Sequence, residues 1–179
     1  SKSAARFDRK KLDWLNGQHI RALAPLALQT RLVAILKAAG FDTSEKDDAW
    51  FATLTEVCQE KLSTLNQIVE LSDFFFQEVT EYEEKPVKKQ WQIDGAAELM
   101  TQLITCMEGV EDWNRDVLKA AYHALGEETG VGLGKMVHPT RLALTGKSIG
   151  PGLFELAELL GKESSLTRMR KGLEYIATL

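Results

Sequence analysis

Three cations stand among glycines, prolines and apolar residues in the most informative run of the sequence, residues 134–154. They are Lys135, Arg141 and Lys147, and the turn-forming Gly150-Pro151-Gly152 follows them. A helix N-terminus has unpaired amide groups and a partial positive charge, so a helix start beside cations and apolar surface suits an anion or a stacked base. Glycines that only cap helices and form turns would give the same pattern. Both readings remain open from the residues alone.

Two nucleotide-binding motifs are matched only in part. Gly146-Lys147-Ser148 has the end of a P-loop, but Arg141 holds the position of that motif's first glycine. The glycines of residues 130–134 match part of a dinucleotide fingerprint, but they follow a helical pattern and not a strand. Nucleotide binding by either motif is therefore not predicted.

Catalytic and metal-binding patterns are not found. Cys58 and Cys106 form no C-x-x-C pair, and the three histidines show no ligand spacing. His138, beside Pro139, is the one histidine in a suggestive place, and a lone histidine at a proline is more often structural than a general base. We predict no catalytic residue, no metal site and no cofactor for this chain.

The charge is unevenly distributed. The 179 residues carry a net charge of −4, yet residues 130–179 contain seven Lys and Arg against four Asp and Glu. This is the distribution expected if a phosphate backbone meets the C-terminal part, although a solvated cationic helix face would look the same. No apolar run approaches the roughly 18 residues of a membrane span, so we expect no membrane segment and a cytoplasmic location.

Apolar residues recur at spacings of three and four, and no segment alternates as a half-buried strand does. The pattern predicts an all-α fold of about nine or ten short helices in two packed helical-bundle subdomains. A charged stretch that contains Pro86 lacks this periodicity and marks the predicted boundary. We expect a first subdomain at 1–80, a linker at 81–92 and a C-terminal subdomain at 93–179.

Capping residues, prolines and glycines predict where helices begin and end. Starts are predicted at Asp8, Pro25, Ser44 or Asp47, Asp94, Asp112, Pro139 and Leu153. Ends are predicted at Asn16-Gly17, Gly40, Gly109, Thr145-Gly146 and Gly161. In the last helix, Arg168, Arg170 and Lys171 are expected to point outward.

Three blocks of sequence, in order along nearly the whole chain, carry a resemblance to a known family. The first is Phe7-Asp8-Arg9-Lys10-Lys11-Leu12-Asp13-Trp14-Leu15-Asn16-Gly17-Gln18-His19-Ile20-Arg21. The second includes Thr64-Leu65 and Ser72-Asp73-Phe74-Phe75. The third is Pro139-Thr140-Arg141-Leu142-Ala143-Leu144-Thr145-Gly146, then Gly150-Pro151-Gly152-Leu153-Phe154-Glu155-Leu156 and Leu159-Leu160-Gly161-Lys162-Glu163. They resemble the helical, anticodon-binding C-terminal half of bacterial-type glutamyl-tRNA synthetases.

The resemblance implies a C-terminal piece of a class I ligase that attaches glutamate to tRNA. In that family a separate Rossmann-type domain performs the chemistry with ATP and Mg²⁺, and its His-Ile-Gly-His and Lys-Met-Ser-Lys-Ser motifs do not occur in this chain. Ser1-Lys2-Ser3 matches the end of the second motif, but it is too close to Phe7-Asp8, so we interpret it as a junction. The implied partners are the tRNA anticodon stem-loop and the catalytic domain in cis, in a monomer that is inactive as a fragment.

The resemblance also implies RNA-binding residues. Arg141 and the turn of Gly150, Pro151 and Leu153 are expected at the anticodon, with Lys135 and Lys147 neutralising phosphates. Relatives have a hydroxyl residue before this proline, where this chain has Gly150. Lys61 stands where many relatives have an arginine near the third anticodon base. Lysine is a point donor and not a planar fork, so the choice between the tRNAs for glutamate and glutamine stays open.

A second functional class stays open beside RNA binding. Phe74-Phe75-Phe76 cannot all lie on one helical stripe, so at least one is expected to pack back across the preceding helices or into a seam between the two domains. If these phenylalanines instead formed an exposed patch, the chain would be a helical protein-interaction module without RNA binding.

Overall fold

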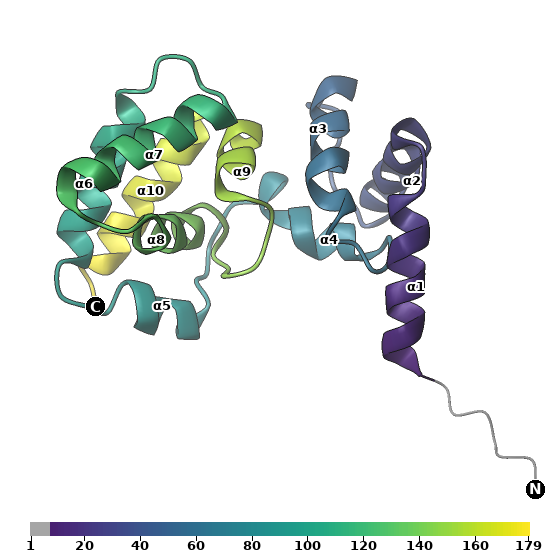
Figure 1. Ribbon diagram of the computed structural model, residues 1–179, viewed down its shortest axis with the longest axis horizontal. Helices are drawn as coiled ribbons and strands as arrows, with labels where there is room; N and C mark the ends of the chain where they lie inside the picture. Colours follow the sequence, from purple (N-terminus) through teal and green to yellow (C-terminus); the bar gives the residue numbers. More distant parts are fainter. Residues whose placement is uncertain (1–7) are drawn as a thin grey trace, which may run out of the picture. The chain divides into compact units, whose positions relative to one another are not determined.

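The computed structural model describes residues 8–179, and these residues fold into helices without a strand (Figure 1). The predicted all-α class is confirmed. Phe7 and the Ser1-Lys2-Ser3 junction lie outside the described residues.

Contacts divide the chain into two compact units, Ser1–Phe76 and Gln77–Leu179. The predicted linker at 81–92 differs from what is observed, because most of it forms a helix, α5 (Glu84–Gln90), in the second unit. Val87 of this helix is buried, and Trp91 directly after it is also buried. Two apolar side chains on a charged segment are too few for a periodic signal, yet they suffice to fix the segment against its neighbours.

The first unit contains four α-helices and a short 3-10 helix within the described residues. In chain order they are α1 (Arg9–Arg21), α2 (Pro25–Ala38), α3 (Asp48–Gln59), α4 (Gln67–Ser72) and η1 (Asp73–Phe75). Asp8 and Asp47 cap α1 and α3 as predicted, since their carboxylates accept hydrogen bonds from the backbone amides of Lys11 and Trp50. Pro25 occupies the first position of α2, where its missing N–H costs nothing.

The predicted helix end at Asn16-Gly17 is wrong, since α1 continues to Arg21. Gly17 is buried, and a Cβ at this position would lie 3.4 Å from the carbonyl oxygen of Leu62. The Asn16 amide donates a hydrogen bond to the carbonyl of Ser63. This dipeptide, which usually signals a turn, instead lets the segment after α3 approach the middle of a helix.

The phenylalanine cluster packs back into the first unit, as predicted. Phe74 and Phe75 are buried. The Phe76 ring stacks on Phe41 at 5.1 Å between centroids, and Trp50 meets Phe75 edge to face at 5.3 Å. These rings are therefore core residues of the first unit.

Cys58 on α3 provides a test of burial through the pH dependence of stability. Its side chain is 0% exposed, and burial raises the pKa of the thiol from 9.0 to about 12, opposed weakly by Lys61. At a pH between these two pKa values the thiol is deprotonated in the unfolded chain and protonated in the folded chain. The unfolding free energy therefore falls as pH rises from 9 towards 12, by up to about 1.4 kcal/mol per pH unit.

Cys58→Ala should therefore show a flatter pH dependence in urea denaturation, although its cavity lowers stability at every pH. Below pH 9 the two proteins should differ by a constant amount. Parallel stability curves up to about pH 11 would show that the thiol titrates normally in the folded state.

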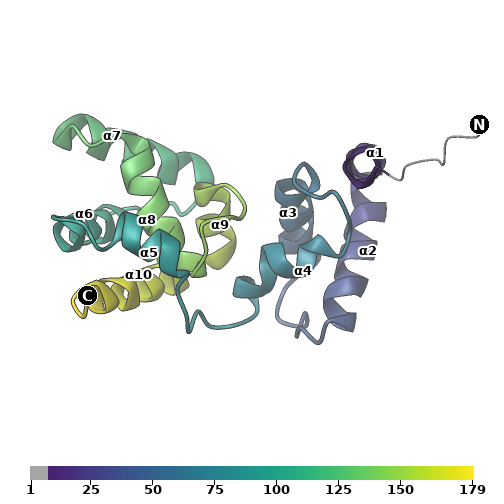
Figure 2. The same ribbon diagram turned by 90° about the horizontal axis from the view of Figure 1, so that it is seen from below.

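The second unit has six helices within the described residues. In chain order they are α5 (Glu84–Gln90), α6 (Ala96–Glu108), α7 (Arg115–Thr129), α8 (Leu133–Thr145), α9 (Leu153–Leu160) and α10 (Lys162–Ile176). The α8 helix contacts each of the other five, and they surround it in both views (Figures 1 and 2). Its long buried face, with Leu142, Ala143 and Leu144 nearly inaccessible, forms the centre of the core.

Two predicted helix starts, Asp94 and Asp112, are replaced as N-caps by near neighbours. Gly95 in a left-handed conformation precedes α6, so Asp94 does not cap it. The Asn114 side chain, and not Asp112, accepts hydrogen bonds from the first amides of α7. Helix ends at Gly109, Gly146 and Gly161 are confirmed.

Arg168 was expected to point outward, but it turns towards the end of α8. Its guanidinium donates hydrogen bonds to the carbonyls of Leu144, at 2.6 Å, and Gln77, at 3.3 Å. The last carbonyls of a helix lack partners within the helix, so this arginine stabilises the α8 terminus.

Candidate nucleic-acid interface

The α8 helix starts earlier than the sequence predicted. It begins at Leu133, directly after the glycines of residues 130–132, so Pro139 lies inside the helix and not in its first turn. Because proline has no backbone N–H, Pro139 cannot donate the helical hydrogen bond to the Lys135 carbonyl. Pro139 is nevertheless buried, and the helix continues to Thr145. Tertiary contacts on every side of α8 offset that loss.

Gly146 ends α8 at a point of close backbone approach. Its φ of +72° is left-handed, and its amide donates to the Leu142 carbonyl at 2.8 Å. A Cβ here would collide with the carbonyl oxygen of Glu81 and lie 3.0 Å from a Val79 methyl group. The turn after α8 is thus pressed against the segment before α5.

Glu83 holds this turn with three hydrogen bonds. Its amide donates to the Gly146 carbonyl at 2.8 Å. Its carboxylate accepts from the Ser148 amide at 3.0 Å and from the Ser148 hydroxyl at 2.9 Å. The turn is therefore fixed from a segment more than sixty residues away in sequence.

Arg141 fixes the second half of the loop. Its guanidinium donates a hydrogen bond to the Pro151 carbonyl, so α8 is tied to the turn that opens α9. Burial lowers the pKa of this half-buried group, and the Glu155 carboxylate opposes the shift. An arginine keeps its charge in proteins despite such shifts, so Arg141 presents a partly desolvated cation at this corner.

Leu153 was expected to lie at the anticodon, but its side chain is buried. Its side chain is 3% exposed, so it belongs to the core under the corner and does not face a ligand as the structure stands. Gly150 and Pro151 are also buried. The physical reason is that α9 presents an apolar face inward from its first residue, with Leu156 and Ala157 continuing it.

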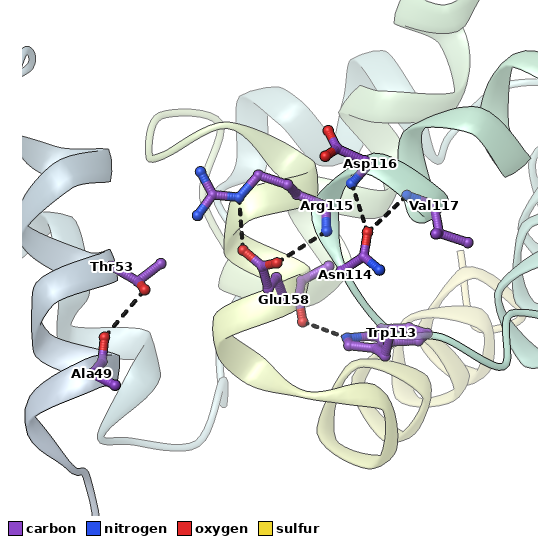
Figure 3. A network of polar contacts seen from close by, with 9 residues as sticks. Ala49, Thr53, Trp113, Asn114, Arg115, Asp116, Val117 and Glu158 are labelled. Carbon is purple, nitrogen blue, oxygen red and sulfur yellow. Dashed lines mark hydrogen bonds and ion pairs between the residues drawn. The ribbon is translucent and has the colours of Figure 1, made fainter.

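Polar contacts from Trp113 and from the first residue of α7 anchor α9 (Figure 3). The Trp113 indole donates to the Ala157 carbonyl at 2.8 Å, and Arg115 forms an ion pair with Glu158 at 2.8 Å. The backbone amide of Arg115 also donates to Glu158, at 3.2 Å. Residue types alone gave no sign of these contacts. They fix the second half of α9 against the start of α7.

The structure brings six of the seven predicted residues into the second unit. Arg141, Lys147, Gly150, Pro151 and Leu153 lie at the corner between α8 and α9, and Lys135 is exposed on the first turn of α8. Lys61 lies in the first unit, exposed just after α3.

Ile149 is a residue that sequence reasoning missed. Its side chain is 76% exposed at the tip of the loop between α8 and α9. An apolar residue flanked by Ser148 and Gly150 in a turn was the available signal. Such a side chain offers an apolar surface to an unstacked base, whereas Leu153 does not.

One open groove borders this corner, and a second groove adjoins the first. One, of about 600 Å³, is lined by α5 and by His138 and Ser148. The other, of about 560 Å³, lies between α5, the start of α6 and the start of α8. Within residues 8–179 no group of three His, Cys, Asp or Glu is placed to hold a metal ion, and no helix is long and apolar enough to cross a membrane.

Comparison with known proteins identifies the family of this chain. Residues 19–173 match the model of a family described as the anticodon-binding domain. The chain belongs to that family. The match spans both units of this anticodon-binding domain, from the end of α1 to the last turns of α10.

Proteins with similar sequences support the family assignment. The domain is 35% identical over 176 residues to glutamate-tRNA ligase 2 of Thermoanaerobacter pseudethanolicus, with 98% of this chain and 37% of the relative covered. It is 36% identical over 180 residues to the glutamate-tRNA ligase of Moorella thermoacetica, with 98% and 36% covered. The chain thus spans little more than a third of the length of these relatives.

Solved structures share this helical fold. A glutamate-tRNA ligase from Elizabethkingia meningosepticum matches with a TM-score of 0.85 and 28% identity, over 98% of this chain and 34% of that one. A glutamate-tRNA synthetase from Elizabethkingia anophelis matches with a TM-score of 0.81 and 28% identity, over 97% and 33%. The resemblance that the three sequence blocks carried is confirmed.

Proposed function

We propose that this domain binds the anticodon stem-loop of the tRNA for glutamate, as part of a cytoplasmic, monomeric glutamate-tRNA ligase. The observation that carries the proposal is the anticodon-binding family match over residues 19–173. In the parent enzyme a catalytic domain in cis uses ATP and Mg²⁺ to attach glutamate. The 179 residues of this chain supply tRNA recognition, and they do not aminoacylate by themselves.

The corner between α8 and α9 is the part of the domain best suited to unpaired bases. Arg141 supplies a cation and planar donors, and its bond to Pro151 holds the turn in one conformation. Lys147 and Lys135 add positive charge for phosphates. Gly150, Pro151 and Leu153 act by shaping the backbone of the turn, since Gly150 has no side chain and the side chains of Pro151 and Leu153 are buried.

The two units divide the work. The second unit carries the corner and reads the anticodon, and the first unit contacts the stem and the third anticodon base through Lys61. The exposed ammonium group of Lys61 is a point donor, so this position attracts RNA without selecting one base edge.

A binding titration tests the proposal. The domain should bind a fluorescent anticodon stem-loop in an anisotropy assay, and the affinity should fall steeply as salt is raised, because cations on the protein replace counterions on the RNA. A stem-loop with a scrambled anticodon should bind more weakly, as base contacts are lost at about 1–3 kcal/mol each. Equal affinity for both loops would reject anticodon recognition.

The alternative of a protein-interaction module finds no surface where it was expected. Phe74 and Phe75 are buried in the first unit, and Phe76 stacks on Phe41. RNA binding is the function that the family match favours.

A further inference from the structure

The groove beside the corner and the groove that adjoins it form one continuous trough. Lys89, Gln90 and His138 line both of them, so a ligand in one groove meets the other directly. We name the combined feature the α5–α8 trough. One end lies at Ser148 and Glu83, the turn that follows α8, and the other lies at Asp94 and Glu98 near the start of α6.

Positive charge is available along the middle of the trough. Lys85 and Lys89 project from α5 and Lys135 from α8, and all three side chains are exposed. None of these ammonium groups forms a hydrogen bond or ion pair with another described residue. They are therefore free to neutralise an anion.

Of the two carboxylates near the corner, Glu84 is paired with a lysine, whereas Glu83 accepts hydrogen bonds from neutral groups and keeps its charge. The Glu83 carboxylate accepts two hydrogen bonds from Ser148, and Glu84 pairs with Lys88 at 2.5 Å. Asp94 and Glu98 stand only at the far end. The three lysines in the middle of the trough therefore attract an anionic strand, while Glu83 at one end and Asp94 and Glu98 at the other oppose it.

Flat and apolar surfaces line the same path. Pro86 lies in the groove nearer the corner, and Ile93, 51% exposed, lies in the other. The exposed imidazole of His138 stands where the two grooves meet. Alternation of cations with surfaces on which bases stack is typical of sites for single-stranded nucleic acid.

The volumes suit nucleotides. Each groove, at about 600 and about 560 Å³, falls within the range of about 300–1,000 Å³ that binds small organic ligands. A chain of two or three nucleotides that leaves the corner at Ser148 would enter the trough without a gap, because Ser148 belongs to both features.

We propose that the α5–α8 trough binds the unpaired nucleotides that adjoin the anticodon, with Lys85, Lys89 and Lys135 on their phosphates and His138 stacked on a base. The inference rests on the proposed function and extends the interface beyond the corner. Single-stranded RNA is the committed ligand.

Salt-dependent titration of the anticodon stem-loop tests the trough. Lys85→Ala, Lys89→Ala and Lys135→Ala should each weaken binding about two- to fivefold and lower the slope of log affinity against log salt by about 0.7. The triple variant should lose about 10- to 100-fold. Lys119→Ala is the matched control, since this exposed lysine of α7 carries the same charge outside the trough. It should bind like the wild type.

Proton NMR of the histidines gives a direct second readout. The chain has three histidines, so His138 can be assigned by His138→Gln, with His19 and His123 as internal references. RNA should shift the imidazole signals of His138 and leave His123 on α7 unchanged. The trough proposal would be overturned if the triple variant kept the affinity and salt slope of the wild type and the His138 signals did not shift. RNA binding by the wild type would in that case still support the proposed function. A wild type that binds no stem-loop would overturn both.

Discussion

Replacing Gly146 with alanine is expected to lower the unfolding free energy by more than about 2 kcal/mol and to abolish RNA binding. Two causes combine at this position. The φ of +72° is unfavourable for any residue with a Cβ, and the new methyl group collides with the Glu81 carbonyl. The turn that Glu83 holds would have to move, and the corner would move with it.

Gly130→Ala is the matched control for this prediction. Gly130 also has a φ of +72° and also ends a helix of the second unit, but no atom lies within 4 Å of its would-be Cβ. It should cost only the backbone strain, about 1–2 kcal/mol, and should leave RNA affinity nearly unchanged. Urea denaturation followed by circular dichroism measures both variants. Equal losses would mean that contact with Glu81 contributes nothing.

Arg141→Ala is expected to lower affinity for the anticodon stem-loop by about 1–3 kcal/mol, roughly five- to 150-fold. The variant removes a partly desolvated cation together with the hydrogen bond that ties α8 to the Pro151 carbonyl. Both losses act on the same surface. Fluorescence anisotropy at fixed salt measures the change, with circular dichroism as the check that the domain remains folded.

Arg141→Lys separates charge from geometry. It keeps the positive charge, but one ammonium group cannot hold the Pro151 carbonyl and also offer the planar donors of a guanidinium to a base. Recovery of only a small part of the lost affinity is the expected result. Full recovery would show that charge alone matters at this position, and wild-type binding by Arg141→Ala would remove Arg141 from the interface.

Local signals in the sequence located much of the fold. The carboxylates of Asp8 and Asp47, Pro25 at its helix start and the glycines after α8 and α9 act through their own backbones, so their effect is visible without knowledge of neighbours. Signals whose effect depends on a contact with a distant segment led to wrong helix boundaries. Asn16-Gly17 allows a close approach to residues 62–63 and does not end a helix, and Pro139 sits within α8 because surrounding helices stabilise it.

The candidate site shows the same division. The sequence drew attention to the cations and the glycine-proline turn, and it could not distinguish the half-buried Arg141, the buried Leu153 and the exposed Ile149. Exposure depends on which face of a helix meets the core. The hydrogen bond from Ser148 to Glu83 and the ion pair between Arg115 and Glu158 join residues far apart in sequence, and no spacing rule predicts them.

The sequence by itself determined the helical class, the basic C-terminal part, the family and the residues around which an RNA site could form. Helical periodicity and capping are properties of neighbouring residues, so they can be read along the chain. The tertiary structure alone decided that α5 packs beside α8, that three unpaired lysines and His138 share one trough, and that the corner is held from both sides. Those features arise from contacts between distant segments, which only the folded core brings together.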